Sequence, residues 1–301
     1  MKIIESVPNF SEGKNEEIVE EIVTQAKKTG KVWVLDYSSD KDHNRSVVTL
    51  AGEPDDMMEA LFLMVKKASE LIDLRKHHGE HPRVGATDVI PLIPILNSSV
   101  DECITISHKL GEKIGKELNI PVFMYEKSAS ASYRKNLSNI RKGEFENFPE
   151  KIKLEEWKPD YGPDIVHETA GVTVVGCREP LIAFNVDLNT NDLQIAQKIA
   201  KAVRHISGGF RYVKALGFRL EEKGIVQISM NLTNYKKTPI YRVFEVIKNE
   251  AERYGVQILG SEIIGLVPQR AVCEVAEYYL RINKFDQSYV LENNILAKSN
   301  E

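Results

Sequence analysis

The feature that most constrains the fold is an order of strands and helices that occurs twice along the chain. In the C-terminal half, residues 181–188 alternate between apolar and polar side chains, as a half-buried strand does. The elements predicted there are a strand at 181–188, a helix at 193–206, strands at 213–220 and 225–233, a helix at 239–253 and a strand at 256–263. This βαββαβ order is typical of a ferredoxin-like unit.

The N-terminal half repeats the order. Its predicted elements are a strand at 3–7, a helix at 15–28, strands at 32–37 and 46–51, a helix at 54–72, a strand at 84–95, and then a further helix at 100–118 and strand at 121–125. The polar segment 127–171 is predicted to form short helices and loops between the domains. We therefore predict an α+β fold of two ferredoxin-like subdomains, residues 1–178 and 179–301.

The C-terminal strands predict a sheet with one polar face. Both helices of a βαββαβ unit cover the same side of the sheet, which leaves the other side uncovered. That side is expected to carry Asn185 and Asp187 from one strand and Gln227, Ser229 and Asn231 from another. Two such sheets, with their helices outside, could face each other across a polar ligand tunnel. A solvated sheet face explains the alternation equally well.

Composition excludes several classes of protein. The net charge of -4 argues against a nucleic-acid partner, which calls for a basic surface. No apolar run reaches the roughly 18 residues that span a bilayer, and residues 1–5 lack the apolar stretch of a signal peptide. We expect a cytoplasmic protein without a membrane partner. Cys103, Cys177 and Cys273 are far apart and are expected to be reduced thiols, mostly buried.

Residues 75–83 form the densest group of ionisable side chains, with three of the seven histidines. Histidine takes and returns protons near neutral pH, so the group could support acid–base catalysis. His77, Glu80 and His81 also match the H-x-x-E-H zinc pattern, which requires a continuous helix. Gly79 and Pro82 disfavour that helix. A solvated polar loop is the third interpretation.

Two further polar clusters lie near the N-terminus. Residues 36–46 join two predicted strands and could be an ordinary turn. Residues 7–13 precede the first predicted helix, where backbone N–H groups can bind a carboxylate or be capped by side chains.

Together these clusters resemble the formiminotransferase family. The matching segments run in family order across nearly the whole chain and are V-P-N-F-S-E-G (7–13), L-D-Y-S-S-D (35–40), H-N-R-S (43–46), H-H-G-E-H-P-R (77–83), G-A-T-D-V (85–89), P-D-Y-G (159–162), L-I-A-F-N (181–185) and G-S-E-I-I-G-L-V-P (260–268). The resemblance implies two ferredoxin-like subdomains around a folate tunnel and a homodimer. It also implies a stand-alone enzyme, since the chain stops at Glu301 without room for the cyclodeaminase domain of animal members.

The activity implied is transfer of a formimino group from N-formimino-L-glutamate to the co-substrate tetrahydrofolate. The products would be 5-formimino-tetrahydrofolate and L-glutamate, a step of histidine degradation that needs no metal. The resemblance makes His81 the general acid–base residue. It assigns folate binding to a loop that comprises Gly162, Pro163, Asp164, Ile165, Val166, His167, Glu168, Thr169, Ala170 and Gly171.

Four more residues are candidates for substrate binding. Arg45 and Arg83 could clamp the glutamate carboxylates, because guanidinium pairs with carboxylate as a two-pronged fork. Asn9 and Asp40 could position the substrate. Animal members have an acid where this chain has Ser38, so Asp40 or Asp42 is expected to assist His81 instead.

Three alternatives stay open. The first keeps the fold with a formyl donor, either N-formyl-glutamate or 5-formyl-tetrahydrofolate. The second is a folate-binding protein without turnover. The third is a zinc hydrolase built on the H-x-x-E-H pattern.

Overall fold

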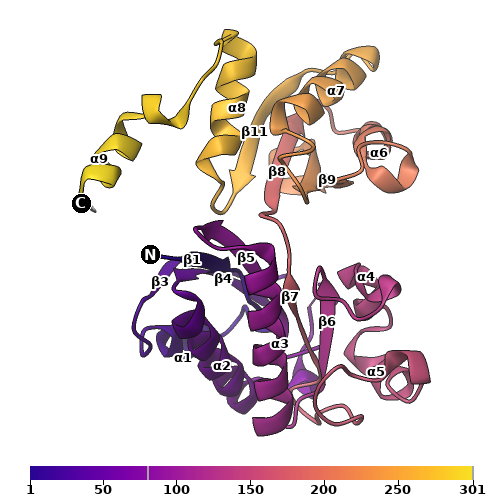
Figure 1. Cartoon of the computed structure of the whole chain (residues 1–301). Helices are drawn as coiled ribbons and strands as arrows, with labels where there is room; N and C mark the ends of the chain where they lie inside the picture. The colour runs from indigo at the N-terminus through magenta and orange to yellow at the C-terminus, as the bar shows by residue number, and fades with distance from the viewer. Residues whose placement is uncertain (80, 300–301) are drawn as a thin grey trace. The chain divides into compact units, whose positions relative to one another are not determined.

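The computed structural model describes residues 1–79 and 81–299, and the chain divides into two compact units, Met1–Arg178 and Glu179–Glu301. Helices and strands alternate in both units, each of which has its own sheet (Figure 1). The predicted α+β class is confirmed at this level.

The first unit is built on a mixed seven-stranded sheet. Its strands are β1 (Ile3–Ser6), β2 (Asn9–Phe10), β3 (Val32–Asp40), β4 (Arg45–Gly52), β5 (Thr87–Leu96), β6 (Val122–Glu126) and β7 (Thr173–Cys177). β1 and β2 follow each other between β4 and β5, and β3 lies beyond β4. These pairings are antiparallel, whereas β7 is parallel to both β5 and β6.

Helices cover both faces of this sheet. On one face lie α1 (Glu16–Ala26), α2 (Pro54–Leu71) and α3 (Val100–Glu117), as Figure 1 shows. Asn15 caps α1 by accepting from two backbone N–H groups, and Ser99 caps α3. On the other face, α4 (Leu137–Arg141) and α5 (Glu144–Lys151) pack against β5, β6 and β7 through Ile140 and Phe148.

Strand β7 corrects the prediction for the segment 127–171. The segment does contain short helices, but it does not simply link two domains. It leads into β7, whose five residues are all buried and which inserts between β5 and β6. The strand is a continuous apolar run without alternation, as expected for a strand covered on both faces. Residues 127–178 therefore belong to the first unit.

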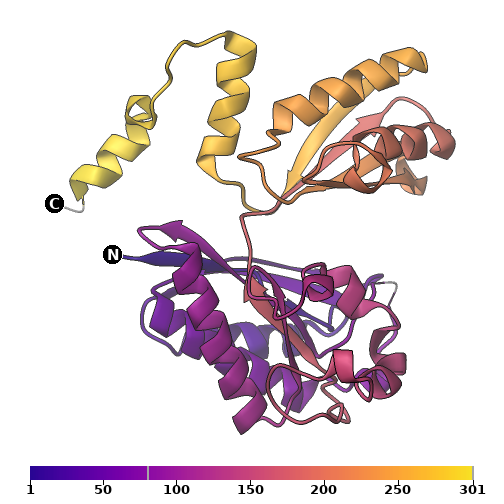
Figure 2. The ribbon, with the colours of Figure 1, turned by 45° about the vertical axis from the view of Figure 1, so that its right-hand side comes forward.

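The second unit follows the predicted order of elements. It contains β8 (Ile182–Leu188), α6 (Leu193–Val203), β9 (Val213–Leu220), β10 (Ile225–Leu232), α7 (Ile240–Arg253) and β11 (Ile258–Ile264). The sheet is antiparallel with the order β11–β8–β10–β9. α6 and α7 pack against one face of it, which can be followed in Figure 2. α6 ends three residues earlier than predicted, because Arg204 is extended and a short 3-10 turn follows.

The other face of this sheet carries the polar side chains of β8 and β10, as the alternation predicts, and also the exposed Leu216 and Phe218 of β9. Ile182, Phe184, Val186 and Leu188 point into the core, whereas Asn185 and Gln227 lie on the opposite side. Glu262 of β11 accepts hydrogen bonds from both amides at 3.1 Å. The polar side chains are therefore tied into one network across three strands.

Two helices at the C-terminus were not predicted. They are α8 (Gln269–Leu280), which adds Ala271 to the second core, and α9 (Leu291–Ser299). Of the helices that the structure describes, none combines the length and the apolar character needed to cross a bilayer.

Candidate functional site

The histidine-rich segment lies between α2 and β5 and is not helical. A short 3-10 turn (Leu74–Lys76) comes first, and the described residues that follow are extended or bent. Gly79 lets this segment approach the β3–β4 turn, since an added Cβ would lie 2.3 Å from the carbonyl oxygen of His43. Asn44 donates from its amide to the carbonyl of His78 at 3.1 Å. Two of the predicted clusters thus form one site.

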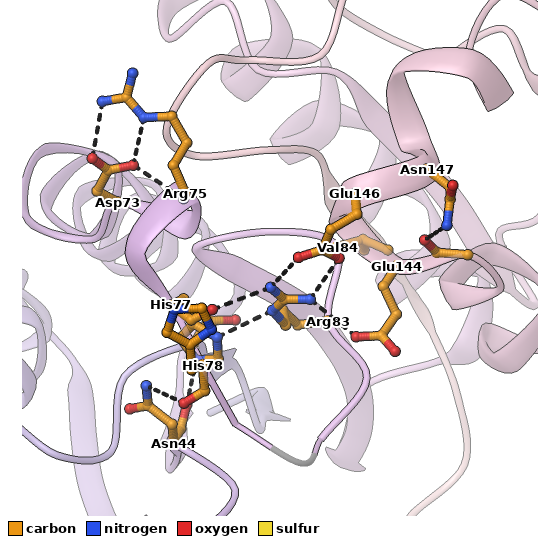
Figure 3. Close-up of polar contacts among 12 residues, drawn as sticks. Asn44, Asp73, Arg75, His77, His78, Arg83, Val84, Glu144, Glu146 and Asn147 are labelled. Carbon is orange, nitrogen blue, oxygen red and sulfur yellow. Dashed lines mark hydrogen bonds and ion pairs between the residues drawn. The ribbon is translucent and has the colours of Figure 1, made fainter.

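Arg83 is held by a complete set of partners (Figure 3). Its guanidinium forms a two-pronged pair with Glu146 at 2.6 and 2.9 Å and reaches Glu144 at 3.0 Å. It also donates to Nδ1 of His77 at 3.1 Å and to the His77 carbonyl at 3.3 Å. These contacts use all five N–H donors of the side chain. Arg83 is also buried. Because these partners engage every donor, the side chain has none left for a substrate carboxylate.

His77 is fixed in one tautomer by the same contacts. Nδ1 accepts from Arg83, so the ring proton is on Nε2, which donates to the carbonyl of Asn44 at 2.8 Å. Burial lowers the pKa of His77. His77 is therefore a neutral bridge between Arg83 and the β3–β4 turn.

These contacts argue against the zinc pattern. Both ring nitrogens of His77 are engaged, and the segment lacks the helix that the pattern requires. Glu80 lies outside the described residues. Within 1–79 and 81–299, no three histidine, cysteine, aspartate or glutamate side chains gather as metal ligands.

His81 is half-buried and faces Arg45. Nη1 of Arg45 contacts Nε2 of His81. A guanidinium has donors only, so Nε2 is the acceptor and carries no proton. Burial, and then the positive charges of Arg45 and Arg141, lower the pKa of His81 to about 3. The imidazole is neutral at physiological pH.

The contacts of Asp40 are with His43 and Asp42 in the β3–β4 turn. Its Oδ2 lies 2.9 Å from Nδ1 of His43, and its Oδ1 accepts the backbone N–H groups of Asp42 and His43 at 2.9 and 2.8 Å. The ring of His43 lies edge-on to that of His81, with 6.4 Å between the centroids. These hydrogen bonds, led by the backbone N–H of His43, lower the pKa of Asp40.

Two residues that sequence reasoning missed complete the surroundings of His81. Arg141 at the end of α4 pairs with Asp88 of β5, and both side chains are buried, at 13% and 4% exposed. The other oxygen of Asp88 accepts the backbone N–H of Val84 at 2.8 Å. Asp88 falls in the G-A-T-D-V motif and could have been singled out there. Arg141 lies in the polar segment 127–171, where no pattern marks it.

Asn9 lies on the same side of the sheet as Arg45. It pairs with Val47, two residues beyond Arg45 on β4, and side chains two apart along a strand share a face. Its amide donates to the carbonyl of Val7 at 2.8 Å. Ser11, the next polar residue, binds the backbone of the segment after His81 through the Gly85 carbonyl at 2.7 Å.

The loop 162–171 is anchored beside the histidine segment. Thr169 accepts from the backbone of Leu74 at 2.9 Å, and Ala170 accepts from Ala86 at 2.9 Å. Gly171 has a positive φ of 69°, and an added Cβ there would lie 2.3 Å from the Val84 carbonyl. The close contact between the loop end and residues 84–86 therefore depends on glycine.

The rest of the loop is polar and partly exposed. Glu168 contacts Arg75, Asp164 pairs with Lys158 at 2.9 Å, and Ile165 is 72% exposed. Nδ1 of His167 accepts from the backbone of Ala170 at 3.1 Å, so its proton is on Nε2.

A neutral histidine beside arginines that have hydrogen-bond donors unpaired among the described residues suits a protein that binds an anionic substrate and moves a proton. Comparison with known families matches residues 3–178 to the N-terminal subdomain of the formiminotransferase domain and residues 183–298 to the formiminotransferase domain. The chain belongs to the formiminotransferase family. The family predicted from the motifs is thus confirmed.

Relatives of known name agree with this assignment. The chain is 53% identical to the glutamate formimidoyltransferase of Streptococcus pyogenes serotype M1, over 98% of this chain and 99% of that protein. It is 45% identical to the glutamate formimidoyltransferase of Thermoplasma acidophilum, over 100% and 99% of the two chains. The formimidoyltransferase-cyclodeaminase of Rattus norvegicus is 39% identical over 97% of this chain, which spans 54% of that protein.

Proposed function

We propose that the protein transfers the formimino group of N-formimino-L-glutamate to tetrahydrofolate, giving 5-formimino-tetrahydrofolate and L-glutamate. The family and the full-length similarity to two glutamate formimidoyltransferases support this activity. The observation that supports a catalytic role for the site is the neutral imidazole of His81, whose unprotonated Nε2 contacts Arg45.

His81 is the proposed general acid and base. The reacting nitrogen of tetrahydrofolate forms a bond to the formimino carbon and gives up its proton to Nε2. The bond from that carbon to the glutamate nitrogen then breaks, and the departing nitrogen takes the proton from His81. One group that acts in both directions typically contributes about 100- to 10,000-fold to the rate.

Substrate binding is assigned to the residues around this ring. Arg45 is the proposed carboxylate ligand, with Asn9 on the same sheet face. Asp40 acts by holding His43 near His81. Arg83 is the weaker clamp candidate, because all five of its donors are engaged. The loop Gly162–Gly171 is the proposed folate contact, and its anchoring beside residues 84–86 supports this.

The fold supports a finer proposal of two ferredoxin-like subdomains around a folate tunnel. In the first unit β1 lies between β4 and β5, and β3 lies beyond β4. In the second unit β8 lies between β10 and β11, and β9 lies beyond β10. The polar face of the second sheet would line the tunnel. We also propose a cytoplasmic homodimer, which light scattering of the purified protein would test.

The test compares His81→Ala with His78→Ala in a transfer assay at saturating folate. His78 is the exposed neighbour in the same segment and serves as the matched control. We expect His81→Ala to lower kcat by about 100- to 10,000-fold while the circular dichroism spectrum is unchanged. His78→Ala should keep wild-type kcat. A folded His81→Ala protein with wild-type kcat would remove His81 from the mechanism.

A second assay offers formimino- and formyl-glutamate as competing donors. The proposal requires faster transfer from the formimino donor, and the reverse preference would make the protein a formyltransferase.

A further inference from the structure

The surroundings of His81 carry more positive than negative charge. Arg45 and Arg141 both act on the pKa of His81, and Asp88 is the carboxylate that opposes them. Asp88 is already paired with Arg141. The next acid, Asp40, is occupied by His43 and two backbone N–H groups. Burial, and then the charge of Arg141, lower the pKa of Arg45 to about 10.

Both arginines also hold buried donors that are not satisfied. Nε of Arg45 and Nε of Arg141 are shielded from solvent and have no hydrogen-bond partner within the described part of the chain. A buried donor left unpaired is unfavourable, and more so when the group is charged. Arg83, two residues after His81 in the sequence, has every donor paired. Nε of Arg134 is also unpaired among the described residues, but the Nη groups of Arg134 pair with Asp160 and with two backbone carbonyls. Arg45 differs, because its Nη1 contacts a neutral histidine.

We propose that Arg45 and Arg141 together bind a carboxylate of the donor's glutamate moiety, and that Asp88 positions Arg141 for this contact. A carboxylate offers the two features that this cluster lacks, negative charge and acceptor oxygens. The identity of the donor rests on the proposed function, whereas the site itself requires only a small dicarboxylate. Arg141 thus becomes the second arm of the clamp, beside Arg45.

Filling the site would release His81 for catalysis. In the structure Nε2 of His81 accepts from Arg45, so its lone pair is engaged. A bound carboxylate draws the Arg45 donor away and neutralises the charges that keep the imidazole unprotonated. The groups facing the ring are Arg45, Arg141, Asp88 and His43, and the carboxylate would add a negative charge beside both arginines. The pKa of His81 then rises, and the ring is able to receive a proton.

The first experiment measures Arg141→Lys against Lys142→Ala. The lysine keeps the charge beside Asp88 but loses the planar fork. We expect the KM for formimino-glutamate to rise about tenfold, which corresponds to about 1.4 kcal/mol, with the KM for tetrahydrofolate unchanged. Lys142→Ala removes an exposed neighbouring cation and should match the wild type. An unchanged donor KM in Arg141→Lys, with the protein folded by circular dichroism, would overturn the proposal.

The second experiment titrates the wild-type protein. The ring signals of His81 in the full-length protein are assigned from His81→Gln and titrated by NMR with and without glutarate, a dicarboxylate that cannot react. We expect the pKa of His81 to rise when glutarate is bound, and no change at saturating glutarate contradicts the proposal. A protein that binds glutarate in this way without transferring a formimino group would keep the carboxylate site and refute the proposed function.

Discussion

Arg83 and Arg45 both contact histidines of the segment 75–83, and the clusters of side chains around these two arginines are built in opposite ways. Arg83 has all five donors engaged by Glu144, Glu146 and His77. Arg45 contacts a neutral histidine and keeps a buried donor unpaired. The first cluster satisfies its own charges, as a structural ion pair does. The second leaves a charge and donors for something outside the chain, at a cost in stability that only a ligand offsets.

This contrast explains why a sequence motif alone does not separate the two roles. Arg45 and Arg83 both lie in histidine-containing motifs, and the guanidinium group of each is suited to binding a carboxylate. What separates them is the supply of carboxylates from α5, where Glu144 and Glu146 reach Arg83. Removing each arginine should therefore affect different properties of the protein.

The largest effect is expected for Arg45→Gln. Truncating one partner of a buried charged pair is unfavourable by about 2–5 kcal/mol, so kcat/KM for the donor should fall by at least about 30-fold. Thermal unfolding should stay the same or shift upward, because a buried cation with an unpaired donor has been removed. Steady-state kinetics and a melting curve check both points. A large loss of Tm with unchanged kinetics would reverse the roles of the two clusters.

The next effect is a loss of stability in Arg83→Gln. Glu144 and Glu146 are 43% and 56% exposed, so they can be hydrated when the arginine is lost. We expect a destabilisation of about 1–2 kcal/mol, which shifts the Tm by a few degrees in a domain of this size. The KM for the donor should change less than in Arg45→Gln. A larger rise in that KM would restore Arg83 as a clamp.

The last expected effect is a pH dependence of stability that comes from His81. Its pKa is about 3 in the folded chain, whereas an unfolded histidine titrates near 6.5. Between these two pKa values His81 binds a proton in the unfolded chain but not in the folded chain. The free energy of unfolding therefore falls as the pH drops below about 6.5. Urea unfolding at pH 7.5 and 5.0 should show a smaller loss in His81→Gln than in the wild type. Equal losses would mean that His81 is not protected from protons.

Sequence reasoning succeeded where the period of the side chains matches a sheet with one covered face. β8 and β10 alternate, and the predicted and observed bounds of the four strands between residues 182 and 264 differ by no more than two residues. It missed β7, because a strand buried on both faces has no alternation to detect. It also missed the two C-terminal helices.

At the site, the sequence identified the histidine segment and Arg45, because short motifs mark them. It did not identify Arg141, which lies 53 residues from its partner Asp88 along the chain. The folding of the segment 127–172 onto the sheet brings these two together, and no local pattern encodes that contact. Arg83 was predicted to bind carboxylates, and it does so, but the carboxylates belong to Glu144 and Glu146 of the segment 127–171.

The place of β7 imposes an order on biosynthesis. A ribosome makes β5 and β6 long before β7, yet β7 is the strand that separates them in the finished sheet. Until β7 has been made, β5 and β6 lack the strand that joins them, and α4 and α5 lack the part of their core that Val174 supplies. Translation must therefore pass the end of the first unit before the surroundings of His81 are complete. A chain truncated before β7 would contain His81 without those complete surroundings.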